Sequence, residues 1–262
     1  MIACAACCAL QAAPSFSAAA RHVAQRAGKT FVPPPILMYH RVDRSSPGDQ
    51  TSRDLTVTPS QLAAQLLYLK AHGIAAISMA DLEDRLAHRR PLDHAVVLTF
   101  DDGYADQYWY AVPLLRKFHA DATFYVITGE LGKARHFTWR QLHSMARDHL
   151  DIAAHGVRHD DLSLMSRQQQ RYQIVQSIST LRNALHAPVD SYAYPSGRFN
   201  LATLAIVRAE GIPLAVTTDA TNVIPPPNAF ELPRIRVRGH WTLHDFLKAL
   251  RNAAAARHSV AR

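Results

Sequence analysis

Short apolar runs alternate with longer helical segments along most of this chain, and that alternation restricts its fold more than any other feature. Several helical segments carry start signals: Pro59 follows Thr58, and Thr138 has Gln141 three residues on, which is the pattern of a capping box. Repeated β-then-α units predict an α/β fold with a parallel sheet, either a closed barrel or an open doubly wound form. We expect strands at residues 36–42, 96–100, 122–127, 192–194, 214–217 and 235–237, and helices beginning at Thr58 and Ser78 and at about 105–119, 138–148, 166–186, 201–210 and 243–257.

The length of 262 residues fits one barrel-like α/β domain better than two independent domains. We place this domain at residues 31–257, after a leader at 1–30 and before a tail at 258–262. The leader has an apolar stretch at 2–13 with no Lys or Arg before it, so it lacks the charged start of a secretory signal. The compartment therefore stays open between the cell envelope or periplasm and the cytoplasm.

Composition narrows both the metal chemistry and the class of partner. All three cysteines, Cys4, Cys7 and Cys8, lie in the leader, so the domain has neither a disulfide framework nor a thiolate metal site. The chain has 29 basic and 21 acidic residues, for a net charge of +8, but the basic residues are scattered and form no patch interleaved with aromatics. We therefore expect no nucleic-acid partner, while association with an anionic cell-envelope surface stays open.

Two polar motifs follow apolar runs that read as buried strands. Asp101 and Asp102 come directly after the run at 95–100, and His155 and His159 come after the run at 150–154. One carboxylate and two imidazoles make three ligands of the type that zinc prefers, and the other carboxylate is then free to act as a base. An Asp-Asp-Gly segment is more often a solvated turn, but the buried strand before it and the histidine pair together favour a metal site.

These motifs, TFDDGY at 99–104 and HGVRH at 155–159, resemble those of the polysaccharide deacetylase family, the NodB-like members of carbohydrate esterase family 4. Segments at 36–40, 192–197 and 232–237 are similar to further family motifs and fall in the family's order. The resemblance is nearest to the branch of poly-N-acetylglucosamine deacetylases. It implies a distorted (β/α) barrel, usually with seven strands, in which active-site groups gather at the carboxyl ends of the strands.

The resemblance also implies a role for each matching residue. Asp102, His155 and His159 would hold a divalent metal ion, with zinc expected, and Asp101 would take a proton from water. A backbone N–H near Tyr104 would help to stabilise the oxyanion. Three residues are expected at the substrate site: Tyr104, Tyr194 and Pro195, with simple packing as the alternative for Tyr194.

This chain departs from the family pattern at three positions. In many relatives a histidine in a late segment protonates the leaving amine. The best match to that segment here contains His244, which lies at an expected helix start instead of a strand end. We therefore predict that His40, at the end of the first strand, protonates the amine. Many relatives carry an arginine where this chain has Ala193, and we predict that Arg234 supplies that charge to Asp101 instead. The usual proline after the second metal histidine is replaced by Asp160.

The leading hypothesis is a metal-dependent hydrolase that removes acetyl groups from an N-acetylated polysaccharide or glycan. One alternative is a deacylase of a small molecule or lipid-linked sugar, and another is a glycan-binding protein without turnover. An aspartyl-phosphatase is disfavoured because Gly103 stands where its second aspartate would be. The sequence determines neither the polymer, nor the physiological metal, nor the oligomeric state.

Overall fold

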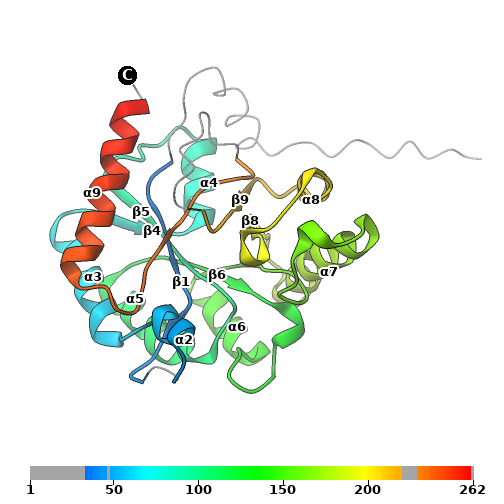
Figure 1. Cartoon of the computed structure of the whole chain (residues 1–262), viewed down its shortest axis with the longest axis horizontal. Coiled ribbons are helices and arrows are strands. Elements are labelled where there is room, and N and C mark those ends of the chain that lie inside the picture. Colours follow the sequence, from blue (N-terminus) through cyan, green and yellow to red (C-terminus); the bar gives the residue numbers. More distant parts are fainter. Residues whose placement is uncertain (1–32, 46–47, 220–228, 261–262) are drawn as a thin grey trace, which may run out of the picture.

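The computed structural model describes residues 33–45, 48–219 and 229–260, which form a curled parallel sheet surrounded by helices (Figure 1). Seven strands follow one another in the order β10, β1, β5, β6, β7, β8, β9, and β4 pairs with the first half of β5. The strands are β1 (Ile36–Tyr39), β4 (Ala75–Ile77), β5 (Ala95–Phe100), β6 (Thr123–Val126), β7 (Asp151–Ala154), β8 (Ser191–Ala193), β9 (Leu214–Val216) and β10 (Ile235–Arg236).

The sheet curls because the segment that leads into β10 also pairs with β9. Leu232 donates its backbone N–H to Ala215 and accepts one from Thr217, at 3.0 and 2.9 Å. A few residues later β10 pairs with β1, where Leu37 is the partner of Ile235. One segment thus joins the two ends of the strand path, and the expected distorted α/β barrel is confirmed.

Helices connect and cover the strands, and most begin where the capping residues predict. Thr58, Thr138 and Ser166 each form a reciprocal capping box with the glutamine three residues on. Ser78 caps the helix that begins at Met79. Helix α3 packs beside α9, and α7 beside α8. The helices are α2 (Gln50–Leu55), α3 (Pro59–Ala71), α4 (Met79–Ala87), α5 (Val112–Phe118), α6 (Trp139–Arg147), α7 (Arg167–Leu185), α8 (Leu201–Ala209) and α9 (Leu243–Val260).

Short elements are where the structure departs from the expectation. The expected strand at 36–42 is divided: β1 ends at Tyr39, and β2 (Arg41–Val42) pairs instead with β3 (Thr56–Val57). Strands β3 and β4 and helix α2 were not expected, because two to six residues carry too little periodicity to be recognised. The expected helix at 105–119 contains a π-helical turn at Gln107–Ala111, two residues after its start. The expected leader at 1–30 lies outside the described residues.

The core is continuous from the sheet to the helices. All six residues of β5 are buried, and the Phe100 ring stacks between Tyr39 and Phe124 with ring centroids 5.0 Å apart on each side. Such burial on both faces is what a parallel sheet covered by helices requires. Among the described helices, none combines the length and the apolarity needed to cross a bilayer.

One partly buried carboxylate lies away from the strand ends where the site motifs lie. Asp151, at the start of β7, accepts hydrogen bonds from the Thr123 hydroxyl at 2.6 Å and from the Ala80 backbone N–H at 3.2 Å. Burial, together with the charge of Asp190, raises the pKa of Asp151 to about 6 despite these donors. The ionised form of this side chain therefore opposes folding at neutral pH.

Candidate metal centre and active site

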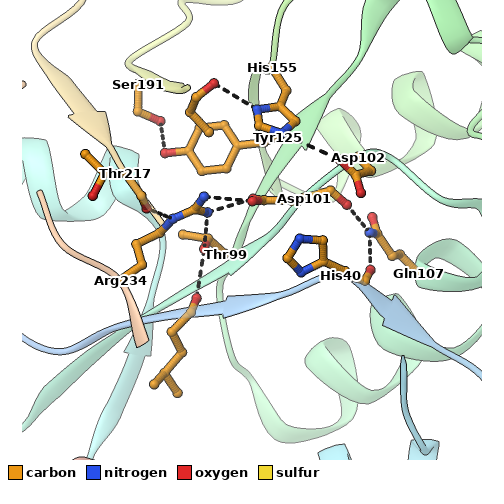
Figure 2. Close-up of polar contacts among 12 residues, drawn as sticks. His40, Thr99, Asp101, Asp102, Gln107, Tyr125, His155, Ser191, Thr217 and Arg234 are labelled. Atoms are coloured by element: carbon orange, nitrogen blue, oxygen red, sulfur yellow. Dashed lines mark hydrogen bonds and ion pairs between the residues drawn. The ribbon is translucent and has the colours of Figure 1, made fainter. Parts of the chain in front are cut away.

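The polar motifs meet at the carboxyl ends of neighbouring strands. His40 follows β1, Asp101 and Asp102 follow β5, and His155 follows β7. In parallel sheets these ends lie on one edge, and Figure 2 shows His40, both aspartates and His155 gathered there. The structure thus brings together residues that lie more than a hundred positions apart in the sequence.

Asp102, His155 and His159 form a cluster with the geometry of a metal site. One potential ligand atom from each lies within 4.8 Å of the others. The Asp102 Oδ1 atom is 3.5 Å from His155 Nε2 and 3.8 Å from His159 Nε2. This oxygen is buried and, among the described residues, accepts no hydrogen bond, which is costly unless a cation faces it.

The orientation of His155 fits the same role. Its Nδ1 lies 2.8 Å from the Ala193 backbone oxygen, so the ring donates there and turns Nε2 toward Asp102 (Figure 2). A ligating histidine ordinarily has such a partner on its other nitrogen, which fixes the tautomer. The three residues therefore fit a divalent metal ion, and His159, whose side chain is 40 % exposed, is the ligand nearest solvent.

The backbone is strained at the second of the two aspartates. Asp102 has φ 72° and Gly103 has φ 70°, so two consecutive residues adopt the left-handed conformation. A non-glycine residue in that region costs about 1–3 kcal/mol, and such strain is concentrated at functional sites. A Cβ added at Gly103 would meet the Phe137 and Val126 side chains at 3.3 Å, which explains why glycine follows the aspartates.

Two of the three residues, Asp102 and His159, are shifted toward the charge states that a metal requires, whereas the two aspartates raise the pKa of His155. Burial raises the pKa of Asp102, but the imidazole of His155, 3.5 Å away, and the charges of His40 and His159 outweigh it, and the pKa lies well below its ordinary value. For His159, burial and the charge of His155 lower the pKa. An ionised carboxylate and a neutral imidazole are the forms that bind a metal ion.

Asp101 is held by Arg234 in a buried, two-pronged ion pair. Arg234 Nη1 and Nη2 lie 2.7 Å from Asp101 Oδ1 and Oδ2, and the two side chains are 0 % and 2 % exposed. Arg234 also donates to the Thr217 backbone oxygen and the Thr99 hydroxyl (Figure 2). Burial raises the pKa of Asp101, but the charges of Arg234 and His155 outweigh it, so the pKa falls below its ordinary value.

Arg234 supplies its charge to Asp101 from a strand end, as predicted. That end is the start of β10, level with the start of β1. The fully buried side chain of Arg234 reaches Asp101 through the interior of the curled sheet. The long, planar guanidinium makes this possible, because it carries five donors that can engage several acceptors at once.

His40 lies beside Asp101, on the side away from Arg234 (Figure 2). It is 8 % exposed, and among the described residues its Nδ1 has no hydrogen-bond partner. Burial lowers the pKa of His40, against the opposing charges of Asp101 and Asp102. The alternative acid, His244, is exposed in the first turn of α9, next to the capping residue Asp245.

Gln107 is a site residue that the sequence did not indicate. It is fully buried in the π-helical turn, and its Nε2 donates to the backbone oxygens of His40 and Asp101. This amide therefore ties together the ends of β1 and β5, which carry the expected acid and base. A lone glutamine in a helical segment has no pattern that would predict such a contact.

The three expected substrate residues have different surroundings. The Tyr104 ring is half-buried, stacks on His136 with centroids 5.2 Å apart, and has the Arg41 guanidinium over it. Burial and the charge of Asp102 raise the pKa of Tyr104 to about 12. Pro195 is buried at the start of a short 3-10 helix, separated from the end of β8 by Tyr194.

Tyr194 requires a correction. Its side chain is 0 % exposed, and its hydroxyl donates to the Phe230 backbone oxygen at 3.0 Å. The ring packs against Phe199 with centroids 4.6 Å apart. Because it has no exposed surface, the expected substrate contact is wrong, and the alternative of simple packing holds.

Comparisons with known proteins identify the family. The family model described as polysaccharide deacetylase matches residues 88–215. The solved structure of Streptococcus pyogenes deacetylase PplD, in complex with acetate, is 33 % identical, with a TM-score of 0.76 over 84 % of this chain and 99 % of that chain. The poly-β-1,6-N-acetyl-D-glucosamine N-deacetylase of Staphylococcus epidermidis is 24 % identical over 77 % of this chain and 78 % of that protein. The structure of IcaB from Ammonifex degensii is 25 % identical, with a TM-score of 0.71 over 86 % of this chain and 98 % of that chain.

The fold and the strand-end site thus define a NodB-like hydrolase, and the chain belongs to the polysaccharide deacetylase family. The expected enzyme class, a hydrolase acting on carbon–nitrogen bonds other than peptide bonds, is confirmed by these relatives.

Proposed function

We propose that this protein removes acetyl groups from an N-acetylated polysaccharide, with a poly-N-acetylglucosamine as the preferred polymer and zinc as the metal. The observation that carries the proposal is the placement of the Asp101–Arg234 pair and His40 beside the three-ligand cluster. The named activity of the Staphylococcus epidermidis relative supports the choice of polymer. Zinc suits the donor set of two imidazoles and one carboxylate.

The residues around the cluster account for the two proton transfers that hydrolysis requires, one from water and one to the leaving amine. Zinc, when bound by Asp102, His155 and His159, would polarise the acetyl carbonyl and make the attacking water more acidic. Asp101 accepts the proton of that water; each of its oxygens receives one N–H from Arg234 and has a second lone pair that can accept. Arg234 holds this carboxylate ionised and fixes its direction.

The leaving amine needs a proton when the carbon–nitrogen bond breaks, and His40 supplies it. Burial disfavours a charged imidazole. The charges of Asp101 and Asp102 favour it but do not outweigh burial, so the pKa of His40 is lowered and its proton is held only weakly. A weakly held proton suits a general acid. When water attacks the acetyl carbon, negative charge develops on the acetyl oxygen. The backbone N–H of Tyr104, at the strained turn after the aspartates, stabilises this oxyanion.

Two alternatives differ from this proposal in the substrate or in turnover. A deacylase of a small molecule or lipid-linked sugar would use the same groups on another acceptor. A glycan-binding protein without turnover would have no need of a base and its arginine beside three ligands, and the presence of both disfavours it.

The test is acetate release by zinc-loaded protein from oligomers of β-1,6-linked N-acetylglucosamine and, separately, from an acetylated aryl ester, with Asp101→Asn as the control. We expect release from the oligomers that rises with their length and is lost in the control. Release from the aryl ester alone would favour a small-molecule deacylase. Zinc binding without release from either substrate would favour the non-catalytic alternative.

A further inference from the structure

The second metal histidine depends on a loop for its position. His155 is fixed at the end of β7 by the strand and by Ala193, whereas His159 lies four residues further on and belongs to no strand or helix. The turn between them passes through Gly156 at φ 81°, where an added Cβ would lie 2.9 Å from the Arg158 backbone oxygen. Whatever fixes this turn therefore fixes the distance from His159 to Asp102.

A glutamine from helix α7 holds the turn from one side. Gln173 is 1 % exposed, and its Oε1 accepts the backbone N–H groups of Val157 and Arg158 at 3.0 and 2.8 Å. Its Nε2 donates to Asp160 Oδ2 at 3.2 Å. One side chain thus bonds to the two residues before His159 and to the residue after it.

The other side of the turn is held mainly by backbone, with one long side-chain contact from the Thr128 hydroxyl to the Gly156 oxygen at 3.5 Å. The N–H groups of Thr128 and Gly129, after β6, donate to the backbone oxygens of Gly156 and Val157 at 3.0 and 2.9 Å. A side-chain substitution does not remove these bonds. Gln173 makes the shorter side-chain contacts of the turn, at 3.0 and 2.8 Å, and a single side-chain change can test them.

Asp160 completes this arrangement. It stands directly after His159 and accepts from Arg158 Nε at 2.9 Å as well as from Gln173. The Asp160 carboxylate needs a donor at position 173, while the backbone N–H groups of Val157 and Arg158 need an acceptor there. A glutamine meets both requirements, whereas a glutamate would place a second carboxylate against Asp160 and a methionine would leave two N–H groups unpaired.

We propose that Gln173 is a positioning residue for the metal centre: through the backbone of residues 157–158 and through Asp160, it holds His159 in reach of Asp102. This inference rests on the proposed metal site. Residues that orient metal ligands typically change metal affinity by about 10- to 100-fold when they are substituted, without removal of any ligand. We expect a loss of that size for Gln173→Met.

The test is zinc affinity, measured by competition with a chromophoric chelator on metal-stripped full-length protein. Gln170→Met is the matched control, because Gln170 lies one turn earlier on α7 and is equally buried, but bonds to Met165 and Thr203 instead of the metal loop. Circular dichroism confirms that each variant is folded. We expect Gln173→Met to bind zinc about 10- to 100-fold more weakly and Gln170→Met to bind it as wild type does.

A charge swap separates positioning from general destabilisation. Gln173→Glu alone should weaken zinc binding, because two carboxylates then face each other. Adding Asp160→Asn should restore it, because the introduced amide can donate to the introduced carboxylate and the net charge returns to that of wild type. Wild-type affinity in Gln173→Met, equal losses in Gln170→Met and Gln173→Met, or failure of the swap to restore binding would overturn the inference. If wild type itself binds no zinc, the proposed function fails instead.

Discussion

Substitution of Arg234 by methionine should cost this protein far more stability than the loss of an ordinary ion pair. The guanidinium is 0 % exposed and makes four hydrogen bonds, two of them to the Asp101 carboxylate at 2.7 Å. Methionine would leave that carboxylate buried and without its partner. Loss of one member of a buried ion pair costs about 3–5 kcal/mol, so we expect a decrease of that size in the free energy of unfolding.

The assay is urea denaturation followed by circular dichroism, with a chelator present so that metal binding does not contribute. Arg85→Met is the control, because Arg85 also pairs with an aspartate, Asp81, at 2.8 Å but is 23 % exposed, and it should cost at most about 1 kcal/mol. In an Asp101→Asn background, Arg234→Met should cost less, because no buried charge is left unpaired. Equal losses for Arg234→Met and Arg85→Met, or an undiminished loss in the Asp101→Asn background, would refute this reasoning.

Three further predictions follow from single residues. Asp151 has its pKa raised to about 6, so the folded state binds more protons than the unfolded state between about pH 4 and 6, and stability falls as the pH rises through that range. Asp151→Asn should therefore raise the free energy of unfolding at neutral pH by up to about 3 kcal/mol, with no gain near pH 4; a gain that does not depend on pH would contradict this. His40→Ala should lower kcat about 100- to 10,000-fold while His244→Ala leaves it near wild type, and the reverse result in acetate-release assays would make His244 the acid. Gly156→Ala should destabilise the fold by about 1–3 kcal/mol and weaken zinc binding, because alanine at φ 81° forces the turn before His159 to move; unchanged calorimetric binding would show that the turn tolerates a side chain.

The sequence predicted the parts of this protein that depend on local pattern. The capping boxes at Thr138 and Ser166 and the buried run of β5 have periodicities and spacings that determine local structure directly. The two strand-end motifs could be placed on one edge of the sheet because parallel strands all end there. The α/β class and a cluster of one carboxylate with the two histidines followed from these features, and the family resemblance assigned that carboxylate to Asp102.

Contacts between distant segments could not be predicted in the same way. The direction from which Arg234 reaches Asp101 depends on how the sheet curls, and the burial of Tyr194 depends on packing against Phe199 and Phe230. Gln107 and Gln173 act through backbone groups, which carry no side-chain signature. Such residues become visible only once tertiary structure shows which buried amides meet which loops.

The most direct test of this account is metal restoration. Metal-stripped wild-type protein would be titrated with zinc while bound metal per chain and acetate release from an N-acetylglucosamine oligomer are measured on the same samples. We predict no release without metal, and release that rises in proportion to occupancy and saturates at one zinc per chain, with His159→Ala binding zinc weakly. Full release from the stripped protein in excess chelator would contradict the central claim that Asp102, His155 and His159 hold a catalytic metal.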